Sequence, residues 1–403
     1  MGRVKLLLTS AGSGLLLAIS WPEIGGSILS LFVAFFPLLW VEEQISKQKG
    51  LAWLAVFFQS YVAFFVFNLI TTYWIYNASL WGACMAVICN SLFMAIVFTL
   101  FHVTKMKVGR KEGYISFVLY WIAFEYLHLN WELSWTWLTL GNAFANKPNL
   151  VQWYEYTGVL GGSVFVLVMN LLAFFGLRDL QSKSNVKLRY LGVIVLSIVA
   201  SFLLSMLALQ NDNATGDEVE VVIVQPNIDP YTTKFRTPPS EQIDKMIELA
   251  KEKLTPTTDY LIFPETAIPE SHWEHEIEFL YATEKIRELH ETSPNLKTII
   301  GSLSTHLFLP GEKLTPAARG FRDGNGFYEN YNSAIFIDSS AQTQMHKKSK
   351  LVLGVEKLPF INAIPFLKKL SINLGGTSGV LGSSEHPTVF RSGKDSAIIA
   401  PII

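Results

Sequence analysis

The first 210 residues consist mostly of apolar runs, and this feature restricts the chain to a membrane-spanning fold. A helix needs about 20 apolar residues to cross the hydrocarbon core of a bilayer. Seven runs reach or approach that length, the first two being short, and a cleavable signal peptide would explain only the first. The runs are Leu6–Trp21, Ser27–Trp40, Leu51–Tyr76, Leu80–Val103, Tyr114–Leu129, Val159–Leu177 and Tyr190–Leu209.

Charge divides the chain into two halves. Residues 1–210 hold 13 Lys/Arg and 8 Asp/Glu, whereas residues 211–403 hold 19 and 25. The first half is therefore basic and apolar, and the second is acidic and mixed. Neither half has the clustered positive charge that a nucleic-acid-binding surface requires, so we expect no nucleic-acid partner.

Basic residues also predict the orientation in the membrane. Twelve of them fall on alternate loops, and the intervening loops hold only Lys147. Basic loops stay in the cytoplasm, so seven crossings place everything after Gln210 on the far side. In a Gram-negative cell this predicts a multi-pass inner-membrane protein with a periplasmic domain. The twelve are Arg3, Lys5, Lys47, Lys49, Lys105, Lys107, Arg110, Lys111, Arg178, Lys183, Lys187 and Arg189.

Three polar or reactive residues lie inside the apolar runs. Cys84 and Cys89 share the fourth run, where we expect two small buried hydrophobes rather than a zinc site or a disulfide framework. Glu125 is the one carboxylate well inside a run. Because such groups are costly in a bilayer, it has a functional or helix-pairing role or lies near the interface. The Trp- and Tyr-rich loop that follows is either an interfacial aromatic belt or a surface that faces a lipid substrate.

From residue 211 onward, short apolar segments alternate with amphipathic ones, which predicts an α/β domain. We therefore expect a transmembrane domain of about seven helices over residues 1–210 and an α/β domain over residues 211–403. Strands are predicted within 218–227 (buried), 259–263, 296–304, 331–340 and 396–403, and helices over 240–254 and 274–291.

Two groups of charged residues follow predicted strands. Glu265 ends the segment LIFPE, where desolvation predicts a raised pKa suited to a general base, although a capping or salt-bridging Glu has the same pattern. Lys347, Lys348 and Lys350 form a cluster, with Glu356 a few residues on. Such a cluster is either a solvated face or the source of an oxyanion donor beside a base.

Several motifs together resemble one family. LIFPETAIP, YNSAIFID and KSKLVLGVE are similar to the nitrilase-like domain of the apolipoprotein N-acyltransferases, the membrane-embedded branch of the carbon–nitrogen hydrolase superfamily. VVIVQPN resembles the first strand of that domain. SWPEIGGSILSLFVAFFPLLW, FEYLH and WLTLGNAFANKPNLVQWYEYTGVLGGS resemble its membrane half. The resemblance implies an αββα sandwich after the helical domain.

The resemblance also implies an activity. Family members move an acyl chain from a phospholipid to a cysteine thiol, and then to the α-amine of an apolipoprotein's diacylglyceryl-cysteine, with no metal or cofactor. By this resemblance Glu265 is the general base. Lys348, three residues before Leu351-Val352, is the catalytic lysine that stabilises the oxyanion, and Glu356 is the second carboxylate. The family's Pro-Phe-Gly-Glu is Leu353–Glu356 here, and its Glu-x-x-Arg is Glu125–His128.

The nucleophile is the largest departure, because residues 211–403 contain no cysteine. We expect the next codon after Ile403 to encode it, since SAIIAPII resembles the apolar strand that precedes the family's catalytic cysteine. The chain by itself is then inactive. Two alternatives remain: a membrane-anchored nitrilase-type amidase that uses water as acceptor, and a non-catalytic homologue that has lost its thiol.

Overall fold

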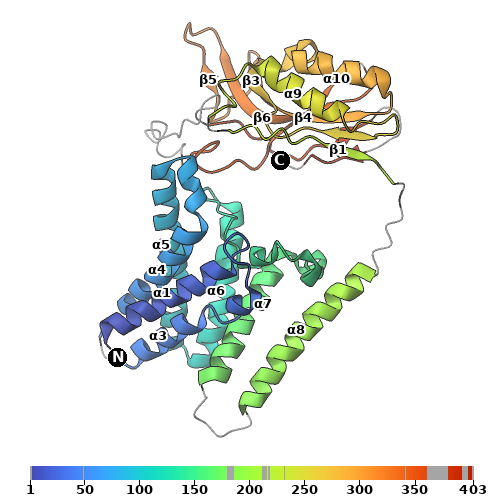
Figure 1. Ribbon diagram of the computed structural model, residues 1–403. Helices are drawn as coiled ribbons and strands as arrows, with labels where there is room; N and C mark the ends of the chain where they lie inside the picture. Colours follow the sequence, from blue (N-terminus) through green and yellow to red (C-terminus); the bar gives the residue numbers. More distant parts are fainter. Residues whose placement is uncertain are drawn as a thin grey trace. The chain divides into compact units, whose positions relative to one another are not determined.

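The computed structural model describes residues 2–48, 50–178, 186–210, 216, 218–230, 232–340, 342–360, 380–392 and 398–401. The chain divides into two compact units, Met1–Ala214 and Thr215–Ile403 (Figure 1). We describe each unit by itself.

The first unit is helical, and its helices coincide with the predicted apolar runs, of which the second is divided between two helices. Six spans in the described residues are long and apolar enough to cross a membrane, counting α2 and α3 together. The remaining helix, α6, is less apolar because it begins Arg110-Lys111-Glu112 and carries Glu125. The helices are α1 (Arg3–Ser20), α2 (Ile28–Leu31), α3 (Phe36–Ser46), α4 (Ala52–Thr71), α5 (Leu80–Lys107), α6 (Arg110–Asn130), α7 (Tyr154–Arg178) and α8 (Val186–Gln210), with 3₁₀ turns at Tyr73–Asn77, Leu140–Phe144 and Pro148–Leu150.

The second apolar run is broken between α2 and α3, and a side chain compensates for the break. Backbone polar groups inside a membrane must be paired within the protein. Asn170 of α7 is fully buried, accepts a hydrogen bond from Phe35 N (2.8 Å) and donates one to Leu31 O (2.8 Å). One amide therefore supplies both partners at the break and ties it to α7.

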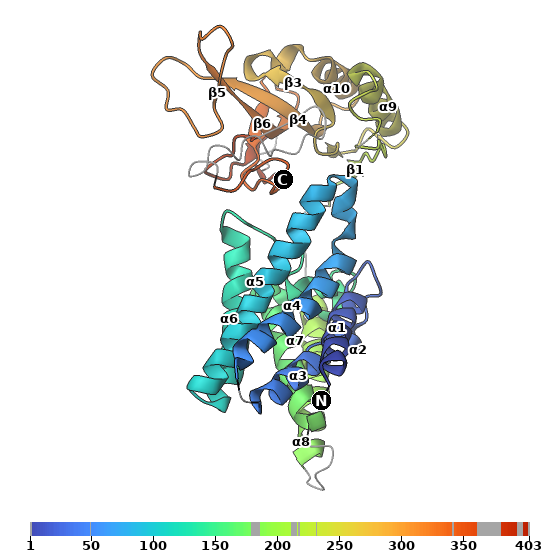
Figure 2. The ribbon, with the colours of Figure 1, turned by 90° about the vertical axis from the view of Figure 1, so that its left-hand side faces the viewer.

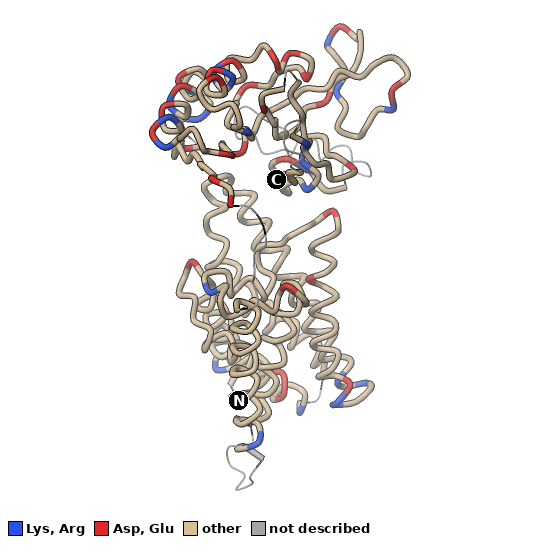
Figure 3. The backbone as a smooth tube through the Cα atoms, turned by 90° about the vertical axis from the view of Figure 1, so that its right-hand side faces the viewer, with Lys and Arg blue, Asp and Glu red and all other residues tan. Residues whose placement is uncertain are grey.

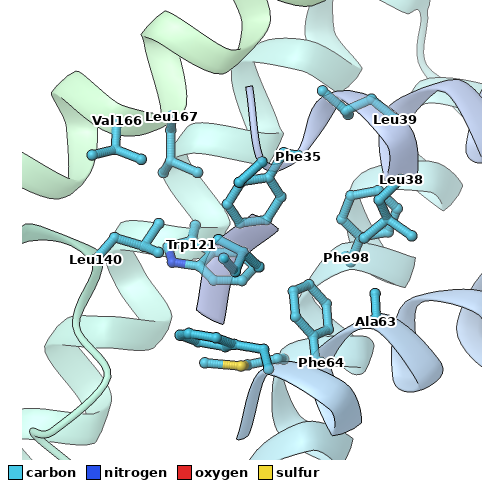
Figure 4. Packing of buried hydrophobic residues seen from close by; sticks show 14 of the residues in the cluster. Phe35, Leu38, Leu39, Ala63, Phe64, Phe98, Trp121, Leu140, Val166 and Leu167 are labelled. Carbon is cyan, nitrogen blue, oxygen red and sulfur yellow. The ribbon is translucent and has the colours of Figure 1, made fainter. Parts of the chain in front are cut away.

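Aromatic side chains fill the centre of this unit (Figure 4). The ring of Phe35 lies edge-on to Trp121 with centroids 5.1 Å apart. The ring of Phe64 packs against those of Trp121 and Phe98, with centroid distances of 5.4 and 6.3 Å. These rings join the α2–α3 break to α4, α5 and α6, which lie side by side (Figure 2). The packing of large apolar rings gives the unit one continuous core.

Both cysteines lie on α5, but not as predicted. Cys84 is exposed and Cys89 is half-buried, and both are free thiols. The expectation of two buried side chains was wrong, because small apolar residues on a membrane helix can face outward as well as inward. Glu125, in contrast, is buried on α6, where it accepts hydrogen bonds from Trp121 Nε1 (3.0 Å) and Leu140 N (2.8 Å). It therefore joins α6 to the 3₁₀ turn that follows.

A buried ion pair lies near the ends of α3 and α5. The side chain of Glu42 is completely buried and accepts a hydrogen bond from Lys105 Nζ. Its other oxygen lies 2.6 Å from Nδ1 of His102, which is also buried. Three polar side chains from two helices are thereby paired with one another away from water.

The neighbouring Glu43 forms ion pairs with two arginines in a more exposed position. It lies 3.1 Å from Arg110 Nη2 at the start of α6 and 3.3 Å from Arg178 Nη1 at the end of α7. Figure 3 shows most Lys and Arg residues of the helical unit toward the end that carries the N-terminus. Charged residues that the sequence assigns to three different basic loops thus meet at one end of this unit.

The second unit is built on a seven-stranded sheet with the order β1-β2-β4-β6-β5, in which β3 also pairs with β4 and β7 with β6. β1, β2 and β4 are parallel, and β6 is antiparallel to β4. The strands are β1 (Val221–Ile223), β2 (Tyr260–Ile262), β3 (Ile268–Trp273), β4 (Lys297–Leu307), β5 (Arg319–Gly320), β6 (Phe327–Ile337) and β7 (Gln344–Lys347), with a separate pair β8 (Phe390–Arg391) and β9 (Ile398–Ile399).

Alternation along β6 distributes its side chains between two layers. Ile335 and Ile337 pack with α9 (Pro239–Lys251) and α10 (Tyr281–Thr292), which cover one face of the sheet (Figures 1 and 2). Phe336 points to the opposite face and stacks on Phe390 of β8. A helical domain followed by an α/β domain is therefore confirmed. Of the predicted αββα layers, the described residues contain one helical layer, the large sheet and the pair β8–β9.

Two details of this unit differ from the prediction. β1 is an edge strand whose Val221 and Ile223 are 43 % and 72 % exposed, so it is not buried. The helix predicted over residues 274–291 is a 3₁₀ turn (Glu274–Phe279) followed by α10, with Leu280 extended between them. The apolar pattern thus predicts β1 but not its place at the edge of the sheet, and it predicts α10 but not the break at Leu280.

Candidate active site

Glu265 lies in a tight turn just beyond the carboxyl end of β2. Gly301 of β4 donates a backbone hydrogen bond to Pro264 O (3.2 Å) and holds the turn against the sheet. A Cβ at position 301 would lie 2.5 Å from Thr266 N and 2.7 Å from Glu265 Cα. Only glycine leaves room for this approach. Thr266 has a φ of +50°, which is rare for a β-branched residue.

Lys348 reaches Glu265 from the end of β7. Its backbone N donates to Asn332 O of β6 (2.8 Å), which extends the β6–β7 pairing by one residue. Its side chain is 8 % exposed, and its ammonium lies 2.8 Å from Glu265 Oε1 and 3.2 Å from Glu356 Oε1. The lysine therefore lies between two carboxylates that are far apart in the sequence.

The other two lysines of the cluster lie elsewhere. Lys347 points to the opposite face, where it pairs with Glu274 (2.7 Å) and lies over the ring of Tyr331. Lys350 is exposed. Because side chains alternate along a strand, the neighbour of Lys348 cannot share its face.

Asn332 completes the cluster, and the sequence reasoning did not single it out. Its Nδ2 donates to Glu265 Oε1 (2.5 Å) and to Glu356 Oε1 (2.8 Å), and the residue is 2 % exposed. The motif YNSAIFID contains this residue, but only the cross-strand register brings it to Glu265. No local signal distinguishes it, because β6 also contains Glu329, Asn330 and Ser333.

Glu356 is held by its own loop. It is buried, and its Oε2 accepts a hydrogen bond from Val352 N (2.7 Å). Gly354 between them has a φ of +87°, which glycine adopts without strain. The glycine of Leu353–Glu356 thus stands one position earlier than in the family's Pro-Phe-Gly-Glu, and the carboxylate of Glu356 still reaches Lys348.

The ion pairs shift the pKa values of both partners. Partial burial would raise the pKa of Glu265, but the hydrogen bond and charge of Lys348, with Asn332 and Lys234, hold it below its ordinary value. The expected raised pKa was therefore wrong, because an ammonium lies against the carboxylate. Burial would lower the pKa of Lys348, yet Glu265 and Glu356 hold it above its ordinary value. At neutral pH the site contains a carboxylate, 51 % exposed, next to a buried ammonium.

This arrangement combines a proton acceptor with a hydrogen-bond donor for developing negative charge. Glu265 is exposed enough to accept a proton from a bound group, and Lys348 Nζ is fixed beside it. A fixed proton acceptor beside a fixed ammonium suits reactions in which a nucleophile loses a proton and an oxyanion forms. Residues 211–403 contain no thiol.

Comparison with known proteins gives one consistent family. Residues 13–172 match the model of the apolipoprotein N-acyltransferase N-terminal domain. The apolipoprotein N-acyltransferase of Chlorobaculum tepidum is 26 % identical over 95 % of this chain and 71 % of its own length. Apolipoprotein N-acyltransferase 1 of Treponema denticola is 24 % identical over 91 % of this chain and 69 % of its own length. The apolipoprotein N-acyltransferase of Geobacter metallireducens is 25 % identical over 91 % of this chain and 67 % of its own length.

Fold and site together define the class, a multi-pass membrane protein that carries an α/β domain with a lysine between two glutamates. The similarity extends through both units of the chain rather than through the membrane half alone. Along nearly its whole length the chain is similar to the apolipoprotein N-acyltransferases.

Proposed function

We propose that this protein transfers an acyl chain from a phospholipid to the N-terminal amine of a diacylglyceryl-cysteine apolipoprotein through a cysteine thioester. The observation that carries the proposal is the position of Lys348, held 2.8 Å from Glu265 and 3.2 Å from Glu356. Similarity to N-acyltransferases over 95 % of the chain supports the choice of acceptor. Both substrates are lipids, which accounts for a site attached to a membrane domain.

In the first half-reaction Glu265 accepts the proton of the thiol, and the sulfur attacks the ester carbonyl of the phospholipid. Lys348 Nζ donates a hydrogen bond to the oxyanion that forms. The ester C–O bond then breaks, Glu265 returns the proton to the leaving oxygen, and a lysophospholipid departs. The acyl chain remains on sulfur as a thioester.

In the second half-reaction the lipoprotein amine attacks the thioester carbonyl. The C–N bond forms, the C–S bond breaks, and a proton of the amine passes through Glu265 to the sulfur. Asn332 and Glu356 keep Lys348 and Glu265 in position through both steps, because Asn332 Nδ2 donates to both carboxylates. The products are an N-acylated lipoprotein and the free thiol.

The location of the site belongs to the same proposal. We place the protein in the inner membrane with residues after Gln210 in the periplasm. The meeting of Glu43 with Arg110 and Arg178 supports this orientation, since it brings the ends of basic loops together on one side of the helical unit.

Residues 1–403 by themselves should form no thioester, because the second unit, Thr215–Ile403, has no cysteine in its sequence. Incubating this chain with phospholipid that carries a labelled acyl group should leave no label that hydroxylamine releases. Label attached to Cys84 or Cys89 would contradict this part of the proposal.

The acyl transfer itself is tested on the protein expressed from its complete gene. Glu265→Gln should lower transfer of labelled acyl chain from phospholipid to a lipopeptide by about 10²–10³-fold, the loss expected for one essential polar group. Glu270→Gln, an exposed glutamate on β3, is the control and should keep the wild-type rate. A wild-type rate for Glu265→Gln would exclude it as the base. Release of ammonia or free fatty acid instead of lipopeptide labelling would favour a hydrolase.

A further inference from the structure

Lys234 is a second lysine at the turn that carries Glu265, on the segment between β1 and α9. Its ammonium donates hydrogen bonds to Thr266 Oγ1 and to the backbone oxygen of Glu265 (3.4 Å). Lys348 approaches the carboxylate of Glu265 from β7, whereas Lys234 contacts the backbone of the turn and the side chain of Thr266. The two lysines therefore hold different parts of the same residue pair.

Two hydrogen bonds hold the backbone of Lys234 in place. Its backbone N donates to Asp229 O (2.9 Å), and its carbonyl oxygen accepts a hydrogen bond from Gln242 Nε2 (2.7 Å). Gln242 belongs to α9 and is 3 % exposed. Its second amide hydrogen goes to Thr237 O (2.9 Å). The position of Lys234 is thus set by the helical layer, and Lys234 transmits it to the turn.

The turn needs such support because its backbone is strained. Thr266 has a φ of +50°, a conformation that β-branched residues rarely adopt and that persists only where surrounding contacts impose it. Two contacts do so here. Gly301 holds the turn through a backbone hydrogen bond to Pro264 O, and Lys234 holds the side chain of Thr266. Strained residues of this kind cluster at functional sites.

We propose that Lys234 is a positioning residue of the site, which fixes the strained turn that presents Glu265 and adds a second positive charge beside it. This rests on the proposed role of Glu265 as the base. Partial burial lowers the pKa of Lys234, and the Glu265 charge opposes that effect. The charge of Lys234 in turn contributes to the lowered pKa of Glu265, after the larger contributions of Lys348 and Asn332. The remaining charged group at the carboxylates is Glu356, which pairs with Lys348.

The first test reads the charge effect without any activity assay. Carbodiimide labels carboxyl groups in their protonated form, so labelling of the Glu265 peptide across pH, quantified by mass spectrometry, reports its titration in the chain of 403 residues. Glu265→Gln assigns the signal. Lys234→Met should move the midpoint upward by roughly half a pH unit or more, because an opposite charge is removed. Lys251→Met, an exposed lysine of α9, should leave the midpoint unchanged.

The second test reads the positioning effect in the protein from the complete gene. Lys234→Met should lower kcat for lipopeptide acylation about 10-fold or more with little change in KM, as expected when a catalytic group is displaced. Lys234→Arg should restore most of the rate. Glycine adopts the φ of Thr266 without strain, so Lys234→Met should cost much less in a Thr266→Gly background than alone.

Each result bears on one proposal. An unchanged Glu265 midpoint in Lys234→Met would contradict the proposed effect of the Lys234 charge. Equal losses of kcat in the wild-type and Thr266→Gly backgrounds would contradict the positioning role. A shifted midpoint in a protein that transfers no acyl chain would support the contact and contradict the proposed reaction instead. If Lys234→Met does not fold, Lys234→Gln, which also lacks the charge, replaces it in both tests.

Discussion

Lys348 differs from its neighbours by which face of the sheet it occupies. Lys348→Met should reduce acyl transfer by about 10²–10³-fold, because an oxyanion donor is lost. Lys347→Met removes an ion pair with Glu274 on the opposite face and should leave the rate within a few-fold of wild type. Lys350→Met is an exposed control. The measurement is label transfer from phospholipid to lipopeptide, and a dead Lys347 variant beside an active Lys348 variant would reverse the assignment.

Glu265 should make the stability of the protein depend on pH in one direction. Its pKa is lower in the folded than in the unfolded chain, so its contribution is present above the ordinary carboxylate pKa and disappears as pH falls through the lowered folded value. Wild type should therefore unfold at a higher temperature than Glu265→Gln at about pH 7, and the gap should close below about pH 4. Thermal unfolding of both proteins across this range is the measurement, and a gap that widens in acid would contradict the lowered pKa.

At the scale of elements, the close contact between β4 and the Glu265 turn depends on one glycine. Gly301→Ala places a Cβ 2.5–2.7 Å from three backbone atoms, which cannot move aside as a side chain would. We expect a loss of about 1–3 kcal/mol in unfolding free energy, as for other overpacked sites, and reduced acyl transfer. Gly320→Ala on β5 is the matched control, because its Cβ would meet only the Phe327 ring at 3.7 Å. Equal denaturation curves for the two variants would show that the turn is free to shift.

The α3–α5 contact offers a second matched pair of substitutions. Glu42→Ala leaves His102 and Lys105 buried without their carboxylate, and breaking such a pair costs about 3–5 kcal/mol. Glu43→Ala removes partly exposed pairs with Arg110 and Arg178, which are worth about 0–1 kcal/mol. Denaturation of the detergent-solubilised protein should therefore show a large shift for the first variant only. A small effect of Glu42→Ala would mean that water reaches the cluster.

The helices and strands were more predictable from the sequence than the way in which they pair and pack against one another. Apolar runs identify the helices, because crossing a bilayer leaves few alternatives, and the strand before Glu265 follows from the apolar residues of LIFPE. The exposure of β1 does not, because the sequence does not say whether a strand lies at the edge. Asn332 was missed for the same reason: its contact with Glu265 depends on how β6 pairs with β4, and a one-residue change in register would turn it to the other face.

The geometry of the site likewise depends on packing more than on local sequence. Glu265 and Glu356 lie 91 positions apart in the sequence, yet both contact Lys348 in the structure. The resemblance to a family supplies the three residue types, but the pKa of Glu265 depends on the distance to the ammonium. That distance is a property of packing, which is why the expected direction of the shift was wrong.

At the scale of the whole molecule, the orientation of the helical unit determines on which side of the membrane the chemistry takes place. Twelve Lys/Arg lie on alternate loops, and Arg110 and Arg178, from two of those loops, meet at Glu43. From this charge asymmetry we expect these loops to lie in the cytoplasm. Seven crossings before Gln210 would then place the second unit on the other side of the membrane.

A pair of reporter fusions tests this orientation. Alkaline phosphatase, which is active only after export, should be active when fused after Gln210 and inactive when fused after Lys111. A reporter that fluoresces only in the cytoplasm should show the opposite pattern at the same two points. The prediction depends on α6 crossing the membrane despite its lower apolarity, because six crossings would return Gln210 to the cytoplasm. Phosphatase activity after Lys111 but not after Gln210 would therefore reverse the topology, and a cytoplasmic soluble unit could not reach lipoproteins outside the inner membrane.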